Sequence, residues 1–285
     1  MQLDLSGRLP ERVLVTGADG KIGRAVVSQL VQSGASVTGL SPHWRQPSAA
    51  DRTVTGDVTN EADVVEALDG AEAVVHLGAL AHPTLGTPYE VYRTNTDGTF
   101  NVLAQAGLRQ IARAVIASSI NAFGVPMNHR QVLPAYFPID EDIPAQLDDP
   151  YSLSKRSDEL TAQMAASRWD MSVVALRYPF VLTEHEVAEV AQQDPAHGVR
   201  EGWSYLDLRD AVDVTIRSLT AQVRDAVIVG VAAPTTYMSR ETEELLAEYA
   251  PDVPRRRAFP GRTGLIDITR AQHLLGFSPT HLYHP

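Results

Sequence analysis

The sequence contains no cysteine among its 285 residues. This absence excludes disulfides, thiolate nucleophiles and cysteine-ligated metal sites together. Positive charge is also scarce, because 24 Lys and Arg stand against 35 Asp and Glu and give a formal net charge of −11. A nucleic-acid partner is therefore not expected, since neutralising phosphates requires clustered basic residues.

Long apolar runs are also missing. No run approaches the roughly 18 residues that a membrane-spanning helix needs, and the N-terminus lacks the basic-then-apolar pattern of a signal peptide. We therefore expect a cytoplasmic protein with no membrane partner. Metal binding is not expected either, because His185-Glu186 lacks a second histidine at helical spacing and no cluster has the spacing of zinc ligands.

Short apolar runs alternate with amphipathic stretches along most of the chain, which is typical of βα units around a parallel sheet. Apolar residues make up 44% of the sequence, which is sufficient for a sizeable core. The pattern predicts an α/β fold with a Rossmann-type doubly wound parallel sheet. Expected strands lie at 11–16, 36–40, 73–77, 114–117, 172–176 and 226–231, and expected helices at 21–33, 89–108 and 151–167, with a further helix capped by Asn60 and ending near Gly70.

Two stretches interrupt this rhythm. Residues 181–198 and 232–285 carry many prolines and predict a small C-terminal substrate-binding lobe over the carboxyl edge of the sheet, where ligands of such sheets bind. Residues 1–180, with 199–231 returning to them, are expected to form the dinucleotide-binding domain.

A glycine motif follows the first expected strand. Gly17, Gly20 and Gly23 stand at the spacing that lets a backbone turn tightly and approach a pyrophosphate at a helix N-terminus. A glycine-rich turn alone would be weak support. Here the motif also opens the first expected helix of a βαβ unit, and this context predicts dinucleotide binding.

The sequence leaves open which dinucleotide is bound. NAD sites usually place an acid at the end of the second strand to hold the ribose 2′-hydroxyl, and no acid stands there. Ser41 and Arg45 occupy this region and could meet a 2′-phosphate, so NADP is slightly favoured over NAD. Asp57 follows the third strand and could accept from the adenine amino group or cap its own loop.

A tyrosine and a lysine stand four residues apart at Tyr151 and Lys155, hence on one face of an expected helix. A phenol is a weak base at neutral pH, and a nearby cation stabilises its phenolate form. Such a pair can exchange a proton with an alcohol or carbonyl while hydride passes to or from nicotinamide. Ser119, at the end of the strand 114–117, could bond the substrate oxygen; the simpler alternative is a solvated helix without chemistry.

Together these motifs resemble the extended short-chain dehydrogenases, also called the NAD-dependent epimerase/dehydratase family. The likeness covers nearly the whole chain. It includes the glycine motif, Gly56-Asp57, His76-Leu77-Gly78-Ala79, Asn95 to Thr99, Ser118-Ser119, Phe123-Gly124, the Tyr151/Lys155 pair, Leu176 to Pro179, Ser204 to Asp207 with Asp210, and Leu274 to Pro279.

The resemblance implies roles for particular residues. Tyr151 would be the acid/base, Lys155 would bind the nicotinamide ribose, and Ser119 would hold the substrate oxygen. The expected cofactor-binding set comprises Gly17, Asp19, Gly20, Lys21, Ile22, Gly23, Ser41, Arg45, Asp57, Val58, Leu77, Gly78, Ala79, Asn95, Tyr151, Lys155, Tyr178 and Pro179. The expected substrate-binding set comprises Ala81, His82, Ser119, Ile120, Asn121 and Trp203. Family members commonly form homodimers through two helices per subunit, here 89–108 and 151–167.

Departures from the family pattern narrow the function. Ile120-Asn121-Ala122 lacks the Asp-Glu pair of the family's dehydratases, and no Asn follows Arg177 as it does in nucleotide-sugar epimerases. Local similarity to uronate dehydrogenases suggests a small sugar-like substrate. The leading interpretation is an NAD(P)-dependent oxidoreductase acting on a secondary alcohol or carbonyl; a sugar epimerase is the alternative, and a non-catalytic cofactor-sensing protein is the third reading.

Overall fold

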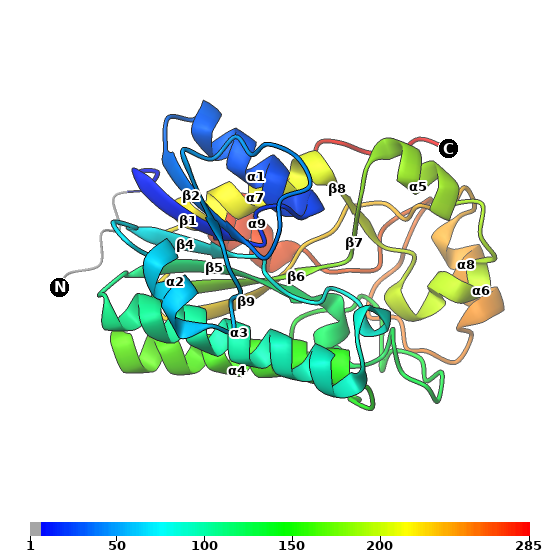
Figure 1. Cartoon of the computed structure of the whole chain (residues 1–285). Helices are drawn as coiled ribbons and strands as arrows, with labels where there is room; N and C mark the ends of the chain where they lie inside the picture. Colours follow the sequence, from blue (N-terminus) through cyan, green and yellow to red (C-terminus); the bar gives the residue numbers. More distant parts are fainter. Residues whose placement is uncertain (1–6) are drawn as a thin grey trace.

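The computed structural model describes residues 7–285, which fold around a parallel sheet of seven strands (Figure 1). The strand order is β3-β2-β1-β4-β5-β6-β9, so the direction of winding reverses between β1 and β4. Ligands of open α/β sheets bind outside the carboxyl ends of the strands at such a reversal. The strands are β1 (Arg12–Thr16), β2 (Ser36–Ser41), β3 (Arg52–Thr55), β4 (Ala73–His76), β5 (Arg113–Ser119), β6 (Ser172–Tyr178) and β9 (Ala226–Gly230).

Helices cover both faces of this sheet, which confirms the predicted doubly wound fold. On one face lie α2 (Glu61–Ala67), α3 (Pro88–Leu108) and α4 (Pro150–Trp169). On the other lie α1 (Lys21–Gln32), α7 (Leu208–Thr220) and α9 (Thr269–Leu275). Strands buried on both faces read as continuous apolar runs, and β4 and β6 are buried at every position.

The two long helices begin at defined caps. Thr87 and Glu90 form a capping box at the start of α3, and the Asp149 side chain accepts a hydrogen bond from Ser152 N at the start of α4. Each helix has proline as its first residue, where a missing N–H costs nothing. The cap at Asp149 places Tyr151 and Lys155 in the first two turns of α4, beside the carboxyl end of the sheet.

The remaining elements form a lobe at one end of the molecule, on the right of Figure 1. The strands β7 (Phe180–Leu182) and β8 (Tyr205–Asp207) pair in parallel as a separate two-stranded sheet. Around them stand α5 (Glu184–Val190), α6 (Pro195–Gly198), α8 (Thr242–Tyr249) and the short 3-10 turns η2 (Ile120–Phe123) and η3 (Val199–Glu201). A further 3-10 turn, η1 (Pro83–Leu85), follows β4.

The lobe is larger than the sequence predicts. Apolar residues between 120 and 143 and between 199 and 205 pack in the lobe core rather than with the sheet, whereas α9 packs against the sheet. The segment 120–143 has no regular periodicity that could assign it to either part. Its position is decided by tertiary contacts, such as the backbone bonds of Phe137 N to Pro254 O and Ile139 N to Leu265 O.

Trp203 belongs to this lobe core. Its side chain is fully buried, and its indole Nε1 donates to Pro195 O at 2.7 Å.

Within residues 7–285, no helix combines the length and the apolar character needed to cross a membrane.

Glu201, at the end of η3, makes stability depend on pH. Burial raises the pKa of its carboxyl from 4.5 to about 8, with Arg200 only partly opposing this. Because the unfolded chain ionises this group at lower pH than the folded chain does, folding stability should fall as pH rises from about 4.5 to about 8.

We expect Glu201→Gln to raise the thermal midpoint relative to the parent protein more at pH 8 than at pH 5, as followed by circular dichroism. Glu189→Gln, on the exposed side of α5, serves as the matched control. It should leave the thermal midpoint close to that of the parent protein at both pH values. An equal effect of Glu201→Gln at both pH values would contradict the assignment of the pH dependence to this residue.

Candidate active site

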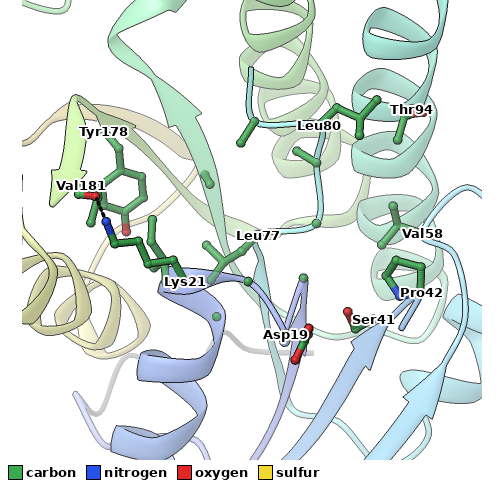
Figure 2. Close-up of a pocket in the computed structure, with 18 of the residues that line it drawn as sticks. Asp19, Lys21, Ser41, Pro42, Val58, Leu77, Leu80, Thr94, Tyr178 and Val181 are labelled. Carbon is green, nitrogen blue, oxygen red and sulfur yellow. Dashed lines mark hydrogen bonds between the residues drawn. The ribbon is translucent and has the colours of Figure 1, made fainter. Parts of the chain in front are cut away.

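A cavity of about 650 Å³ lies at the carboxyl ends of the central strands, where the lobe meets the sheet (Figure 2). Most of the residues that the sequence singles out line it. From the expected sets these are Gly17, Asp19, Gly20, Lys21, Ile22, Gly23, Ser41, Arg45, Asp57, Val58, Leu77, Gly78, Ala79, Ala81, Ser119, Tyr151, Lys155, Tyr178 and Pro179.

The glycine loop between β1 and α1 forms the floor of this cavity. Gly17 has a φ of +63°, and a Cβ there would lie 2.7 Å from Gly78 N. A Cβ on Gly23 would lie 2.2 Å from Gly17 O, so the helix and the loop can approach only without side chains. Gly20 caps α1 without a side-chain hydrogen bond, and the first turn carries no acid. The N–H groups of that turn, which have no side-chain cap and belong to residues that line the cavity, therefore fit the pyrophosphate of a dinucleotide.

Lys21 connects this loop to the lobe. Its ammonium donates to Val181 O at 2.9 Å (Figure 2) and also pairs with Glu186 on α5. The bond from Lys21, together with those from Thr183, lowers the pKa of Glu186 to about 2. The side chain of Lys21 is thus engaged with the lobe, and only its backbone lies in the position that the glycine motif predicts.

An ion-pair cluster lies beside the carboxyl end of β2. The buried carboxylate of Asp19 accepts from Arg45 Nε at 2.9 Å and also pairs with Arg24. These contacts, led by the bond from Arg45, lower the pKa of Asp19 to about 2. The Arg45 side chain remains largely exposed and lines the cavity, with Ser41 and His43 next to it.

Three polar side chains also line this cavity. Ser119 ends β5, and Tyr151 and Lys155 lie on α4, 32 and 36 positions further along the chain. Ser119 Oγ accepts from both Asn121 N and Asn121 Nδ2 at 3.1 Å. Lys155 Nζ donates to Ala117 O at 2.9 Å and to Asp158 Oδ2 at 3.3 Å. The arrangement places a hydroxyl, a phenol and an ammonium around one space.

Several of the expected residues lie outside the cavity lining. Asn95, expected at the cofactor, lies behind the cavity wall, where it bonds both Leu80 backbone groups and Ser154 Oγ. His82, expected at the substrate, is outside the lining and caps η1 by accepting from Thr84 N. Ile120 and Asn121 are buried behind Ser119 rather than exposed to the cavity.

The structure also places the two expected aromatic residues. Trp203, expected at the substrate, is in the lobe core and outside the cavity lining. Tyr178 lines the cavity with its ring, but its hydroxyl is turned into the core, where it bonds Thr215 at 2.6 Å and where burial raises its pKa. Tyr178 therefore offers the cavity an apolar ring rather than an acid or base.

Sequence reasoning missed some of the lining. The additional residues are Leu40, Pro42, His43, Gly56, Leu80, Thr94, Ala117, Ser118, Phe180 and Val181. Position after a strand could have found most of them, because His43 follows β2, Leu80 follows β4 and Phe180 follows β6. Thr94 is on α3 and carries no such signal. Among residues 7–285, no three His, Asp or Glu side chains are arranged to hold a metal ion.

A doubly wound sheet with a glycine loop at its point of reversal defines a Rossmann-type dinucleotide-binding protein. Comparison with known proteins makes this class more specific. The sequence profile of the NAD dependent epimerase/dehydratase family matches residues 13–230, and the chain belongs to that family. It is accordingly an NAD(P)-dependent enzyme of the oxidoreductase and epimerase group.

Individual relatives are distant. The chain is 31% identical over 199 residues to an L-arabinose 1-dehydrogenase (NAD(P)(+)) from Haloferax volcanii, covering 67% of this chain and 76% of that protein. It is 28% identical over 169 residues to a uronate dehydrogenase from Pseudomonas putida, covering 58% of this chain and 59% of the relative. A UDP-glucose 4-epimerase from Brucella ovis solved with NAD has the same fold, with a TM-score of 0.71 at 18% identity, over 95% of this chain and 94% of that one.

Proposed function

We propose that this protein is a dehydrogenase that transfers hydride between NAD(P) and a secondary alcohol or carbonyl of a small sugar-like substrate. The observation that carries the proposal is the meeting of Ser119, Tyr151 and Lys155 in the same cavity as the glycine loop. A protein that only sensed the cofactor would have no need for this combination of groups.

Hydrogen-bond directions suggest how the site would act. Both acceptor positions of Ser119 Oγ are taken by Asn121, so its own proton is free to donate to a substrate oxygen. Tyr151 would remove the proton from that oxygen in oxidation and return it in reduction. Lys155, fixed by Ala117 O, would stabilise the phenolate form of Tyr151. The bound cofactor supplies the hydride acceptor or donor.

The substrate class is argued from the chain and its relatives. No carboxylate follows Ser119 in η2, so dehydration of the kind found in 4,6-dehydratases lacks its proton shuttle. The names of the arabinose and uronate dehydrogenases point to free monosaccharides and sugar acids. UDP-glucose 4-epimerases are also among the relatives, so an epimerase is the second candidate.

Tyr151→Phe removes only the phenolic oxygen and should reduce turnover by roughly 100-fold or more, the range typical of a lost acid/base. The measurement is NAD(P)H formation at 340 nm with a panel of aldoses and uronates, alongside NADH binding by fluorescence, which should be nearly unchanged. Tyr283→Phe, in the lobe, is the control. Retention of most activity in Tyr151→Phe would refute the acid/base role, and epimerised sugar formed without net NAD(P)H would favour the epimerase.

We also propose that NADP is preferred over NAD. The cavity wall after β2 carries Ser41, His43 and Arg45, and no acid in the place where NAD enzymes bind the ribose 2′-hydroxyl. The single negative charge of Asp19 is shared between Arg24 and Arg45, which leaves this region with a net positive charge for a 2′-phosphate.

Arg45→Ala should weaken NADPH binding by roughly 10- to 150-fold, since a charge-assisted hydrogen bond contributes about 1.5–3 kcal/mol. NADH binding should change little. Fluorescence titration with both cofactors measures this, with Arg52→Ala on β3 as the control. An equal loss of affinity for NADPH and NADH in Arg45→Ala would contradict the preference for NADP. A parent protein that binds NADH more tightly than NADPH would also contradict it.

A homodimer is proposed from an exposed apolar surface on α3 and α4. The two helices pack side by side, and the outward face carries Tyr89 (71% exposed), Tyr92, Phe100 (53%), Leu153 and Leu160 (56%). Large apolar side chains gathered on one face favour burial against a second copy, and a two-fold axis pairs such a face with itself.

Replacing Phe100 and Leu160 together by Glu should convert the dimer into a monomer, because four buried charges per interface would repel and lose hydration. Light scattering after size-exclusion chromatography measures the mass, and circular dichroism checks the fold. Leu274→Glu, exposed on α9, is the control. A monomeric parent protein, or a double variant that remains dimeric, would overturn this proposal.

The cytoplasmic location and the absence of nucleic-acid and membrane partners stay predictions of the sequence.

A further inference from the structure

A row of buried polar side chains lies between Lys155 and the loop after β4, and the mechanism above uses none of them. Thr16, His76, Thr99 and Asp158 come from β1, β4, α3 and α4, and each is at most 4% exposed. Buried polar groups are costly unless they are hydrogen-bonded, so the partners of this row must account for its placement.

The contacts of Thr16 determine which groups donate and which accept in the hydrogen bonds of this row. Its hydroxyl oxygen accepts from Leu77 N at 3.2 Å and from Gly78 N at 3.1 Å. Since both acceptor positions are used, the hydroxyl proton is available to donate to His76 Nδ1, which lies 2.7 Å away.

His76 must then carry its proton on the other nitrogen. Burial, followed by the nearby Lys155 charge, lowers the pKa of His76 to about 3, so the ring is neutral at physiological pH and has a single N–H. With Nδ1 accepting from Thr16, that N–H is on Nε2 and donates to Thr99 Oγ1 at 3.1 Å.

Thr99 continues the row toward α4. Helical hydroxyls often donate to the carbonyl four residues earlier, as Thr96 does to Tyr92 O at 2.8 Å, but within the described chain Thr99 makes no such bond. Its hydroxyl is close enough to Asp158 to lower the pKa of that carboxyl, against the larger effect of burial. Asp158 Oδ1 is buried and has no hydrogen-bond partner among residues 7–285.

Asp158 ends the row at Lys155. Its Oδ2 lies 3.3 Å from Lys155 Nζ, and both side chains are at most 5% exposed. Burial raises the pKa of Asp158 to about 6, with Lys155 opposing, so the group is ionised above that pH. The neighbouring carboxylate, Glu159, is already paired with Arg156 on α4 and Arg177 on β6.

We propose that Asp158 is a positioning residue that acts through Lys155. It holds the ammonium in place and, as a buried counter-charge, limits how strongly Lys155 stabilises the Tyr151 phenolate, while Thr99, His76 and Thr16 fill the space between it and the loop that lines the cofactor cavity. The inference rests on the proposed function, because it takes Tyr151 and Lys155 as the acid/base pair. Tyr151, Lys155 and Asp158 are spaced i, i+4 and i+7, so they share one face of α4.

The first test needs neither substrate nor cofactor. Ionisation of Tyr151 is followed by difference absorbance at 295 nm between each protein and the same protein carrying Tyr151→Phe. Asp158→Asn should lower the titration midpoint of this phenol by about one pH unit, a tenfold change, because it removes a negative charge about 10 Å along the helix.

Asp213→Asn, an exposed carboxylate paired with Arg217 on the opposite face of the sheet, is the charge-matched control and should leave the midpoint in place. A midpoint that is unchanged or raised in Asp158→Asn would overturn the counter-charge role.

The second test is measured on the protein with Asp158 intact, so it does not depend on the folding of Asp158→Asn. Nitrogen-15 NMR of the histidine rings, with His76 identified by the signals missing from His76→Gln, should show the neutral Nε2–H form from pH 5 to 8. A proton on Nδ1, or a charged ring, would mean that His76 does not accept from Thr16 and donate to Thr99. That result would overturn the proposed hydrogen-bond order. If no sugar is turned over, the proposed function fails, whereas these two measurements still decide the inference.

Discussion

Direct contact between backbones at the β1–α1 turn is the constraint on which the rest of the site depends. Gly17 and Gly23 approach so closely that a methyl group on Gly23 would lie 2.2 Å from a carbonyl oxygen, and Gly17 equally touches the loop after β4. This contact brings the N-terminus of α1, the carboxyl end of β1 and the β4 loop into one place. A cavity with open N–H groups results at the point where the sheet reverses its winding.

Side-chain networks then hold α4 against that cavity. Glu159 accepts from Ser118 Oγ on β5 and forms two bonds with Arg177 on β6, all of them buried. Removing one partner from such a network leaves a buried charge without compensation, which typically costs about 3–5 kcal/mol. Because α4 carries Tyr151 and Lys155, these contacts also fix where the phenol and the ammonium stand relative to Ser119 at the end of β5. Structure and proposed chemistry thus depend on the same helix–sheet junction.

The lobe meets the sheet through polar contacts on the far side of the cavity. Lys21 joins the glycine loop to Val181 and Glu186, and the carboxylate of Asp210 on α7 binds Thr280 and His281 near the C-terminal end. Exposed ion pairs contribute little to stability on their own. Lys21, however, bonds across the edge of the cavity, so its contact sets how closely β7 stands to the first turn of α1.

The sequence by itself determined the parallel sheet, the glycine loop and the residues Ser119, Tyr151 and Lys155, because each depends on local spacing: apolar runs for buried strands, glycine where a Cβ cannot fit, and four residues for one helical face. Only the tertiary structure decided that Trp203 lies in the lobe core, that Asn95 holds Leu80 behind the cavity wall and that the Tyr178 hydroxyl turns to Thr215. It also decided that segment 120–143 joins the lobe and that Asp158 meets Lys155 at one end of a row reaching Thr16. The physical reason is that these outcomes depend on which distant side chain satisfies a buried polar group or fills a gap in packing, and local spacing carries no information about partners tens of residues away.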